Sequence, residues 1–209
     1  MSSRQYIIVT DRMTLSDQKE YKLKALAAGL ARTFQQSIGN GLDVPSRVPK
    51  SPTPDECLAY IKAGSWPPSI DQRDFQCALD AGAAVDHWRT APLVAVGTPY
   101  SIFQAIAVPA VGLRANAVVV WYGVTLETVP TDVSRIIFRR TNAAGSVIAE
   151  FDLEELAVQQ TLDCFFSEPV IWDKEMPYSI TVLAKIATGA FSRVKPKNFL
   201  FEPAGTLHV

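Results

Sequence analysis

Residues 117–127 read Ala-Val-Val-Val-Trp-Tyr-Gly-Val-Thr-Leu-Glu, and five further runs of similar character follow before residue 205. All are short and rich in β-branched or aromatic residues, and the five are SRIIFRRT (134–141), SVIAEFDL (146–153), CFFSEPVIW (164–172), YSITVLAKIA (178–187) and NFLFEP (198–203). Turn-forming residues separate the runs at fairly regular intervals, which is typical of an antiparallel sandwich or barrel. The stretch 117–205 therefore predicts a mainly β fold.

Two earlier segments extend this prediction toward the N-terminus. Proline and glycine punctuate the apolar runs 93–96 and 102–108, which we expect to form strands. The total of about eight strands is the number that a two-sheet jelly roll uses. Residues 142–145 (NAAG) predict a hairpin turn, and Asp152 is placed to cap one helical turn over residues 153–156. Residues 91–209 are thus predicted to form a jelly-roll-like antiparallel β-sandwich.

In the N-terminal region the apolar residues recur with the spacing of a helix and not of a strand. A helix is predicted over residues 16–38, capped by Thr14 with Asp17 three residues on, and ended by the Gly-Asn-Gly sequence at 39–41. Its apolar positions recur at spacings of three and four and form one stripe, namely Leu23, Leu26, Ala27, Leu30, Ala31, Phe34 and Ile38. Lys19, Lys22, Lys24 and Gln35 lie off it. The stripe must be buried, either on this chain's own sandwich or on a neighbouring subunit.

A proline-rich segment follows the helix. Four prolines within residues 42–54 favour extended backbone, either as a surface connection or as an arm across a neighbouring subunit. A second helix is predicted to open at Pro54 with Thr53 or Asp55 as its cap, and a third to span residues 71–81. The predicted organisation is therefore an N-terminal helix and proline-rich arm region over 1–90 and the sandwich over 91–209.

Composition narrows the class of protein. The chain of 209 residues is 48% hydrophobic, enough for a sizeable core, and its net charge of −1 argues against a nucleic-acid partner, which requires a basic face. Cys57, Cys77 and Cys164 form no paired motif and are expected to be buried free thiols. The N-terminus lacks a signal-peptide core, and no apolar run approaches the roughly 18 residues of a membrane span. We expect a soluble protein made in a reducing cytoplasm.

Motifs for metal, nucleophilic and phosphate chemistry were sought and not found. The two histidines, His87 and His208, have no second ligand at metal-binding spacing. There is no G-x-S-x-G nucleophile elbow, and the one Gly-x-Gly sequence, at 39–41, follows a helix instead of preceding one. No cofactor, metal or catalytic residue is therefore predicted.

Carboxylates and tryptophans leave two alternatives open. A β-sandwich glycosidase needs two carboxylates about 5–10 Å apart, and Glu150 and Asp152 would share a strand face. The other acidic residues of this part of the chain are Glu154, Glu155 and Glu168. A glycan-binding module would instead stack an exposed tryptophan on a sugar, for which Trp66 or Trp172 are candidates. Trp121, inside an apolar strand, is expected in the core.

Four C-terminal segments resemble β-sandwich segments of tailed-phage virion proteins of the cement, decoration and minor capsid class. They are EFDLEEL (150–156), FFSEPVIW (165–172), YSITVL (178–183) and FLFEPAG (199–205). The resemblance implies a jelly-roll-like module that lies on a capsid as a trimer and clamps neighbouring shell subunits. It implies no catalytic residue.

We therefore expect a non-enzymatic virion structural protein, made in the host cytoplasm, that stabilises a shell through protein–protein contacts. The expected partners are copies of itself, as a trimer, and the major capsid protein, with no nucleic acid, membrane, small-molecule substrate or cofactor. One alternative is a glycan-binding or receptor-binding β-sandwich module of a phage tail. A further alternative is a β-sandwich hydrolase that uses Glu150 or Asp152.

Overall fold

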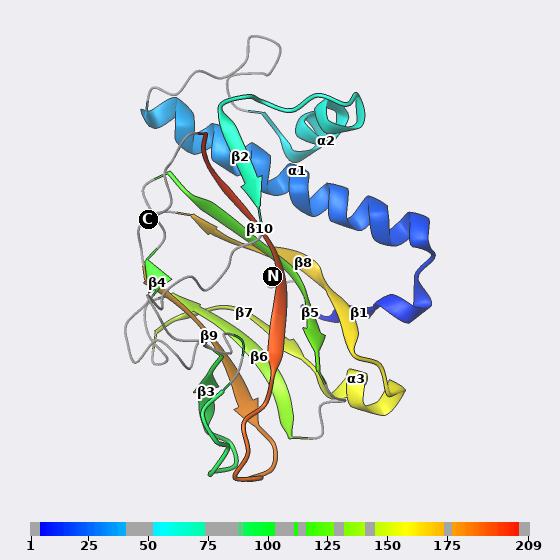
Figure 1. The fold of residues 1–209 in the computed structure, drawn as a ribbon, viewed down its shortest axis with the longest axis vertical. Helices are drawn as coiled ribbons and strands as arrows, with labels where there is room; N and C mark the ends of the chain where they lie inside the picture. Colours follow the sequence, from blue (N-terminus) through cyan, green and yellow to red (C-terminus); the bar gives the residue numbers. More distant parts are fainter. Residues whose placement is uncertain are drawn as a thin grey trace.

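Two antiparallel sheets form the body of the chain in the computed structural model (Figure 1). The structure describes residues 5–40, 52–73, 88, 90–102, 111–112, 116–127, 132–140, 145–173 and 177–204. In order across the first sheet, the strands are β1 (Ile7–Val9), β8 (Asp163–Asp173), β5 (Val118–Leu126), β10 (Val194–Pro203) and β2 (Ile70–Arg73). In the second sheet they are β3 (Pro99–Ser101), β9 (Pro177–Ala184), β6 (Val133–Arg140) and β7 (Val147–Asp152), and β4 (Val111–Gly112) also pairs with β9. The predicted mainly β sandwich is confirmed.

The order of pairing explains how distant parts of the sequence meet. β5 pairs with β10 in the first sheet, and β6, the next strand along the chain, pairs with β9 in the second. The β6–β9 pair thus lies inside the β5–β10 pair along the sequence, as if one long hairpin were folded over into two sheets. A jelly roll has the same nested order of pairing. β6 and β7 form the predicted hairpin, with Phe138 opposite Ala149, while most of its turn lies outside the described residues.

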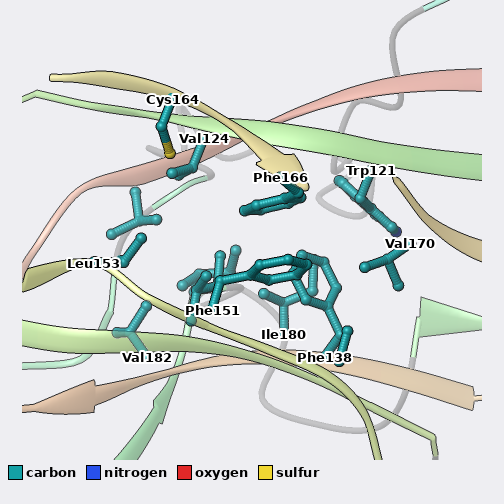
Figure 2. Close-up of a cluster of buried hydrophobic side chains, with 14 of the residues drawn as sticks. Trp121, Val124, Phe138, Phe151, Leu153, Cys164, Phe166, Val170, Ile180 and Val182 are labelled. Atoms are coloured by element: carbon teal, nitrogen blue, oxygen red, sulfur yellow. The ribbon is translucent and has the colours of Figure 1, made fainter. Parts of the chain in front are cut away.

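Aromatic side chains fill the space between the two sheets. Figure 2 shows Phe166 and Trp121 from the first sheet facing Phe151 and Phe138 from the second. The rings of Phe151 and Phe166 stack with centroids 4.0 Å apart, and Trp121 meets Trp172 edge to face at 4.8 Å. Offset and edge-to-face pairs of this kind add to the free energy gained by burying the rings. The prediction that Trp121 belongs to the core is confirmed.

A helical layer covers the outer face of the first sheet. It consists of α1 (Leu15–Asn40) and α2 (Pro54–Lys62), and Figure 1 shows α1 lying across the strands. The buried side chains of α1 pack against β5, β8 and β10 and against α2; its buried hydrophobic residues are Ala25, Ala27, Leu30, Ala31 and Phe34. Of the stripe predicted from the sequence, Ala27, Leu30, Ala31 and Phe34 are thus buried within this chain and Leu26 is partly buried, while the side chain of Ile38 lies outside the described residues.

Specific contacts anchor α1 at two points, near its start and in its second half. The ring of Tyr21 stacks on Phe165 of β8 at 4.7 Å, and its hydroxyl donates to the Phe166 carbonyl. Further along the helix, Arg32 forms an ion pair with Asp173 at the end of β8. Because these contacts reach opposite ends of one strand, they fix the direction of the helix over the sheet as well as its position.

The caps of the first two helices follow the sequence. The Asp17 N–H donates to the Thr14 hydroxyl at 3.1 Å, so Thr14 caps α1 as predicted. Thr53 caps α2 in a capping box, because its hydroxyl accepts from Glu56 N–H while the Glu56 carboxylate accepts from Thr53 N–H at 2.7 Å. A short helix, α3 (Glu154–Gln159), follows β7, and the Asp152 carboxylate accepts from Glu154 N–H at 2.8 Å. A single 3₁₀ turn spans Thr10–Arg12.

Two predicted elements are wrong where the structure describes them. Residues 71–73 belong to strand β2 and not to a helix, because backbone pairing with β10, with Asp71 opposite Glu202, overrides the helical spacing of the apolar residues. Residues 93–96 form no strand; their N–H groups bond to the loop before β10 and to the Tyr100 hydroxyl. The remainder of the predicted third helix, residues 103–108 and the prolines at 45 and 49 lie outside the described residues.

Both predicted regions contribute to one sheet. β1 and β2 come from residues 1–90, and they pair with β8 and β10 from residues 91–209. The helical layer from the first region also shares its buried cluster with the first sheet. The described parts of the two regions therefore both contribute to the core between the sheets and to the cluster beneath the helices.

The close approach of α1 to the sheet gives the first prediction. A Cβ on Gly29 would lie 2.6 Å from Val120 Cγ2 and would overlap the Phe201 ring, closer than Cβ atoms come to other heavy atoms. Overpacking of this kind costs about 1–3 kcal/mol. We expect Gly29→Val to lower the free energy of unfolding by that amount in urea denaturation followed by tryptophan fluorescence.

The matched control is Lys22→Val, which introduces the same β-branched side chain at an exposed position of the same helix. Surface changes of this kind alter stability by about 0.5 kcal/mol or less. Equal losses in the two variants would show that helix propensity, and not the fit of α1 on the sheet, sets the effect.

Candidate functional site

The carboxylates considered for glycosidase chemistry are engaged in structural contacts. Arg135 donates to Glu150 Oε1 at 2.6 Å across the β6–β7 pair, and Asp152 caps the start of α3. The side chains of Glu154 and Glu155 bind Lys185 at 3.0 Å and Gln159 at 2.6 Å respectively. Glu168 lies on β8, in the other sheet. The structure thus places Glu150 and Asp152 on one strand, as predicted, but gives each of them a structural partner.

The tryptophans are part of the fold. Trp172 is fully buried between the sheets, so the prediction that it could lie at a sheet edge and stack on a sugar is wrong. Trp66 is partly buried, donates its ring N–H to the Ile70 carbonyl at 2.7 Å and stacks near Phe201 at 6.3 Å. Trp88 meets Trp121 edge to face at 6.2 Å. Trp172 therefore has no exposed ring face that could stack on a sugar, and the partly buried ring of Trp66 has less than a fully exposed tryptophan would.

The two described cysteines are buried free thiols, as predicted. Burial raises the pKa of Cys57 to about 11 and, as the largest effect, also raises the pKa of Cys164 to about 12. Both thiols are accordingly protonated at neutral pH, and the thiolate is the form that acts as nucleophile or metal ligand. Cys77, His87 and His208 lie outside the described residues.

A part-buried ion pair links two strands of the first sheet. Lys197 of β10 pairs with Asp163 of β8, whose Oδ1 also accepts from the Thr125 hydroxyl at 2.7 Å. The Lys197 ammonium lies 4.6 Å from the centroid of the Phe165 ring, within the range of a cation–π contact. These contacts join three neighbouring strands through side chains, in addition to their backbone pairing.

The described residues offer neither a metal cluster nor a spanning helix. No group of three or more His, Cys, Asp or Glu side chains within them is placed to hold a metal ion. In the same part of the chain, no helix combines the length and apolarity needed to cross a membrane.

The most distinctive surface is an exposed apolar end of the sandwich. It is formed by residues 91–97 (APLVAVG), which lead into β3, and residues 186–191 (IATGAF), which connect β9 to β10. We call these two segments the apolar tip. Four of its side chains are large, hydrophobic and exposed: Val94 (69%), Val96 (64%), Ile186 (48%) and Phe191 (45%). In Figure 1 the tip lies at the lower end, away from α1 and α2.

Backbone hydrogen bonds hold the two segments of the tip together. Leu93 N–H donates to the Ala190 carbonyl at 2.8 Å, and Gly189 N–H donates back to the Leu93 carbonyl at 2.9 Å. Gly97 N–H donates to the Ala184 carbonyl at 2.9 Å. Leu93 itself is fully buried in the core, so it anchors the tip to the sandwich while its neighbours point outward.

The tip was not predicted as a functional surface. Its first segment contains Leu93, Val94 and Val96, a run that reads equally well as a half-buried strand. The usable signal was the absence of any charged residue in either segment, combined with proline and glycine in segment 91–97, which disfavour a continuous strand. Sequence alone does not show that the two segments meet.

Comparison with known proteins adds no family. No family model, curated protein or solved structure matches the chain. The described residues combine ion-paired surface charges, buried neutral thiols and an exposed apolar end of the sandwich.

The raised thiol pKa values give the second prediction. In a Cys77→Ser chain at pH 8, about one in a thousand Cys57 thiols and one in ten thousand Cys164 thiols are ionised, because each pKa unit is a factor of ten. We expect both to react with a disulfide reagent at least about 100-fold more slowly than the same chain unfolded in guanidinium.

The pH dependence of the reaction rate tests whether the raised thiol pKa values cause the slow reaction. Since both pKa values lie above 10, the native rate should rise about tenfold for each pH unit between 8 and 10. A thiol that reacts at the unfolded rate at pH 8 would contradict the burial of that side chain.

Proposed function

We propose that the chain is a non-enzymatic virion structural protein of the cement, decoration or minor capsid class. In this role it stabilises a shell through protein–protein contacts, with further copies of itself and the major capsid protein as partners. The sequence runs at 150–156, 165–172, 178–183 and 199–205 support the proposal by their resemblance to that class.

The observation that carries the proposal is the contrast between a cross-linked body and an uncharged end. The body has three layers joined by two buried clusters. The Arg32–Asp173 ion pair also ties α1 to the first sheet, and the Lys197–Asp163 pair ties two strands within that sheet. At the end away from the helical layer, the apolar tip presents aliphatic and aromatic side chains to solvent. Exposed apolar surface of this kind marks sites of interaction with another protein or with a membrane. A body that holds its shape and presents a fixed contact surface is what a shell-stabilising protein requires.

The third prediction tests the location and the role together. We expect the chain to co-purify with virus particles in a fixed ratio to the major shell protein, measured by quantitative mass spectrometry. Particles from a genome in which the coding sequence is deleted should release their nucleic acid at a temperature lower by several degrees, because contacts between shell subunits are lost.

The control is to add the purified chain back to the deletion particles, which should restore the release temperature. Deletion particles as stable as the parent, or particles that contain no copy of the chain, would contradict the proposal.

A further inference from the structure

The apolar tip is pre-formed for removal from water. Val94 and Ala95 donate their N–H groups to the Tyr100 hydroxyl at 3.0 and 2.9 Å. The N–H groups of Leu93, Gly97 and Gly189 bond to carbonyls of the tip or of the adjoining end of β9. A buried donor without a partner costs about 1–3 kcal/mol. Because these five donors already have partners inside the chain, a contacting surface can cover them without incurring that cost.

The rim of the tip carries charges of both signs. Lys185 and Arg193 immediately flank segment 186–191, and each forms an ion pair, Lys185 with Glu154 at 3.0 Å and Arg193 with Glu127 at 2.8 Å. All four side chains are between 40 and 54% exposed. Such exposed pairs contribute little to stability, so their charges are available to rearrange toward a contacting surface.

This distribution of charge favours one kind of partner. An anionic membrane or a nucleic acid is attracted by a surface with an excess of positive charge. On this rim, Lys185 and Arg193 are each paired with a carboxylate. A rim that contains both signs is complementary to itself, because in a symmetric contact the cations of one copy face the carboxylates of the other. The net charge of −1 gives two copies almost no overall repulsion.

We propose that the apolar tip is the surface through which a second copy of this chain binds. The hydrophobic centre would be formed by Val94, Val96, Ile186 and Phe191 of each copy, and the two ion pairs would form the polar rim. An apolar centre with a polar rim is the usual anatomy of a protein interface. This inference deepens the proposed function, on which it rests for its biological setting, by naming the surface and the partner.

The first experiment measures the mass of the full chain in solution by light scattering over a range of concentrations. We expect the wild type to form an oligomer, at a multiple of 22.9 kDa, that dissociates on dilution. Val96→Asp and Ile186→Asp each place a charge in the centre of the contact and should raise the dissociation constant at least about 100-fold, since desolvating an unpaired charge is costly. Circular dichroism and thermal unfolding confirm that the variants are folded.

The matched control is Leu15→Asp. Leu15 is 85% exposed, but it is the first residue of α1, away from the tip and its rim (Figure 1), so this variant should keep the wild-type dissociation constant. A wild type that is monomeric at all concentrations would overturn the proposal. An oligomer unaffected by Val96→Asp and Ile186→Asp would overturn it as well, since the contact would then lie elsewhere.

Charge reversal on the rim gives a second, independent test. Arg193→Glu makes the Arg193–Glu127 part of the rim negative in one chain, and Glu127→Arg makes the same part positive in another. Each variant alone should associate at least about tenfold more weakly than the wild type, and an equimolar mixture should recover association, because opposite rims attract. No recovery on mixing would contradict the assigned rim.

Three outcomes separate this inference from a lipid-binding tip and from the proposed function. Sedimentation of a monomeric wild type with vesicles of neutral and anionic phospholipid, lost in Val96→Asp, would assign the tip to lipid and overturn the proposal. A monomer that still binds and stabilises deletion particles would overturn the self-association alone. A tip-dependent oligomer that is absent from particles would instead overturn the proposed function and leave the self-association intact.

Discussion

The burial of β5 on both faces is the constraint on which the rest of the structure depends. Eight of its nine residues are buried, and β8 and β10 occupy both of its edges. A strand in this position needs apolar cover above and below, since an exposed Val118 or Val120 would lose the free energy that burial provides. The second sheet supplies one cover and α1 the other, so the N-terminal helix is a structural layer of the sandwich.

Much of this arrangement can be predicted from the sequence, but for different reasons in different elements. The helix α1 follows from its spacing and its Thr14 cap, and the strands β5 to β10 from their apolar and β-branched runs. What the helix packs against was left open, because its stripe is equally suited to a sheet of the same chain or of another. The run Val118–Leu126 held the missing information, since an apolar run without alternation is typical of a strand covered on both faces.

The elements that were predicted wrongly are those decided by distant partners. β2 is only four residues long and polar at Asp71, Gln72 and Arg73, and it is a strand because β10 offers its backbone there. Residues 93–96 have the composition of a strand, yet their N–H groups are taken by the loop 186–192 and by Tyr100. In both segments the local sequence preference is weak, and hydrogen bonds to residues far along the chain decide the secondary structure. A single sequence does not show which distant segment supplies those partners.

The candidate site also depends on long-range contacts. Sequence patterns single out residues with reactive or stacking side chains, and in the structure Glu150, Asp152, Trp66 and Trp172 hold the fold together. The apolar tip has no such residue, and its importance arises from two segments about 90 positions apart that share hydrogen bonds. Leu93 is anchored in the core, and the N–H groups of Leu93, Val94, Ala95, Gly97 and Gly189 have partners within the chain, so this part of the tip backbone is held in place before any contact is made. Pre-organisation of this kind lowers the entropic cost of association, and it is the reason that an end composed of simple aliphatic residues can serve as a specific binding surface.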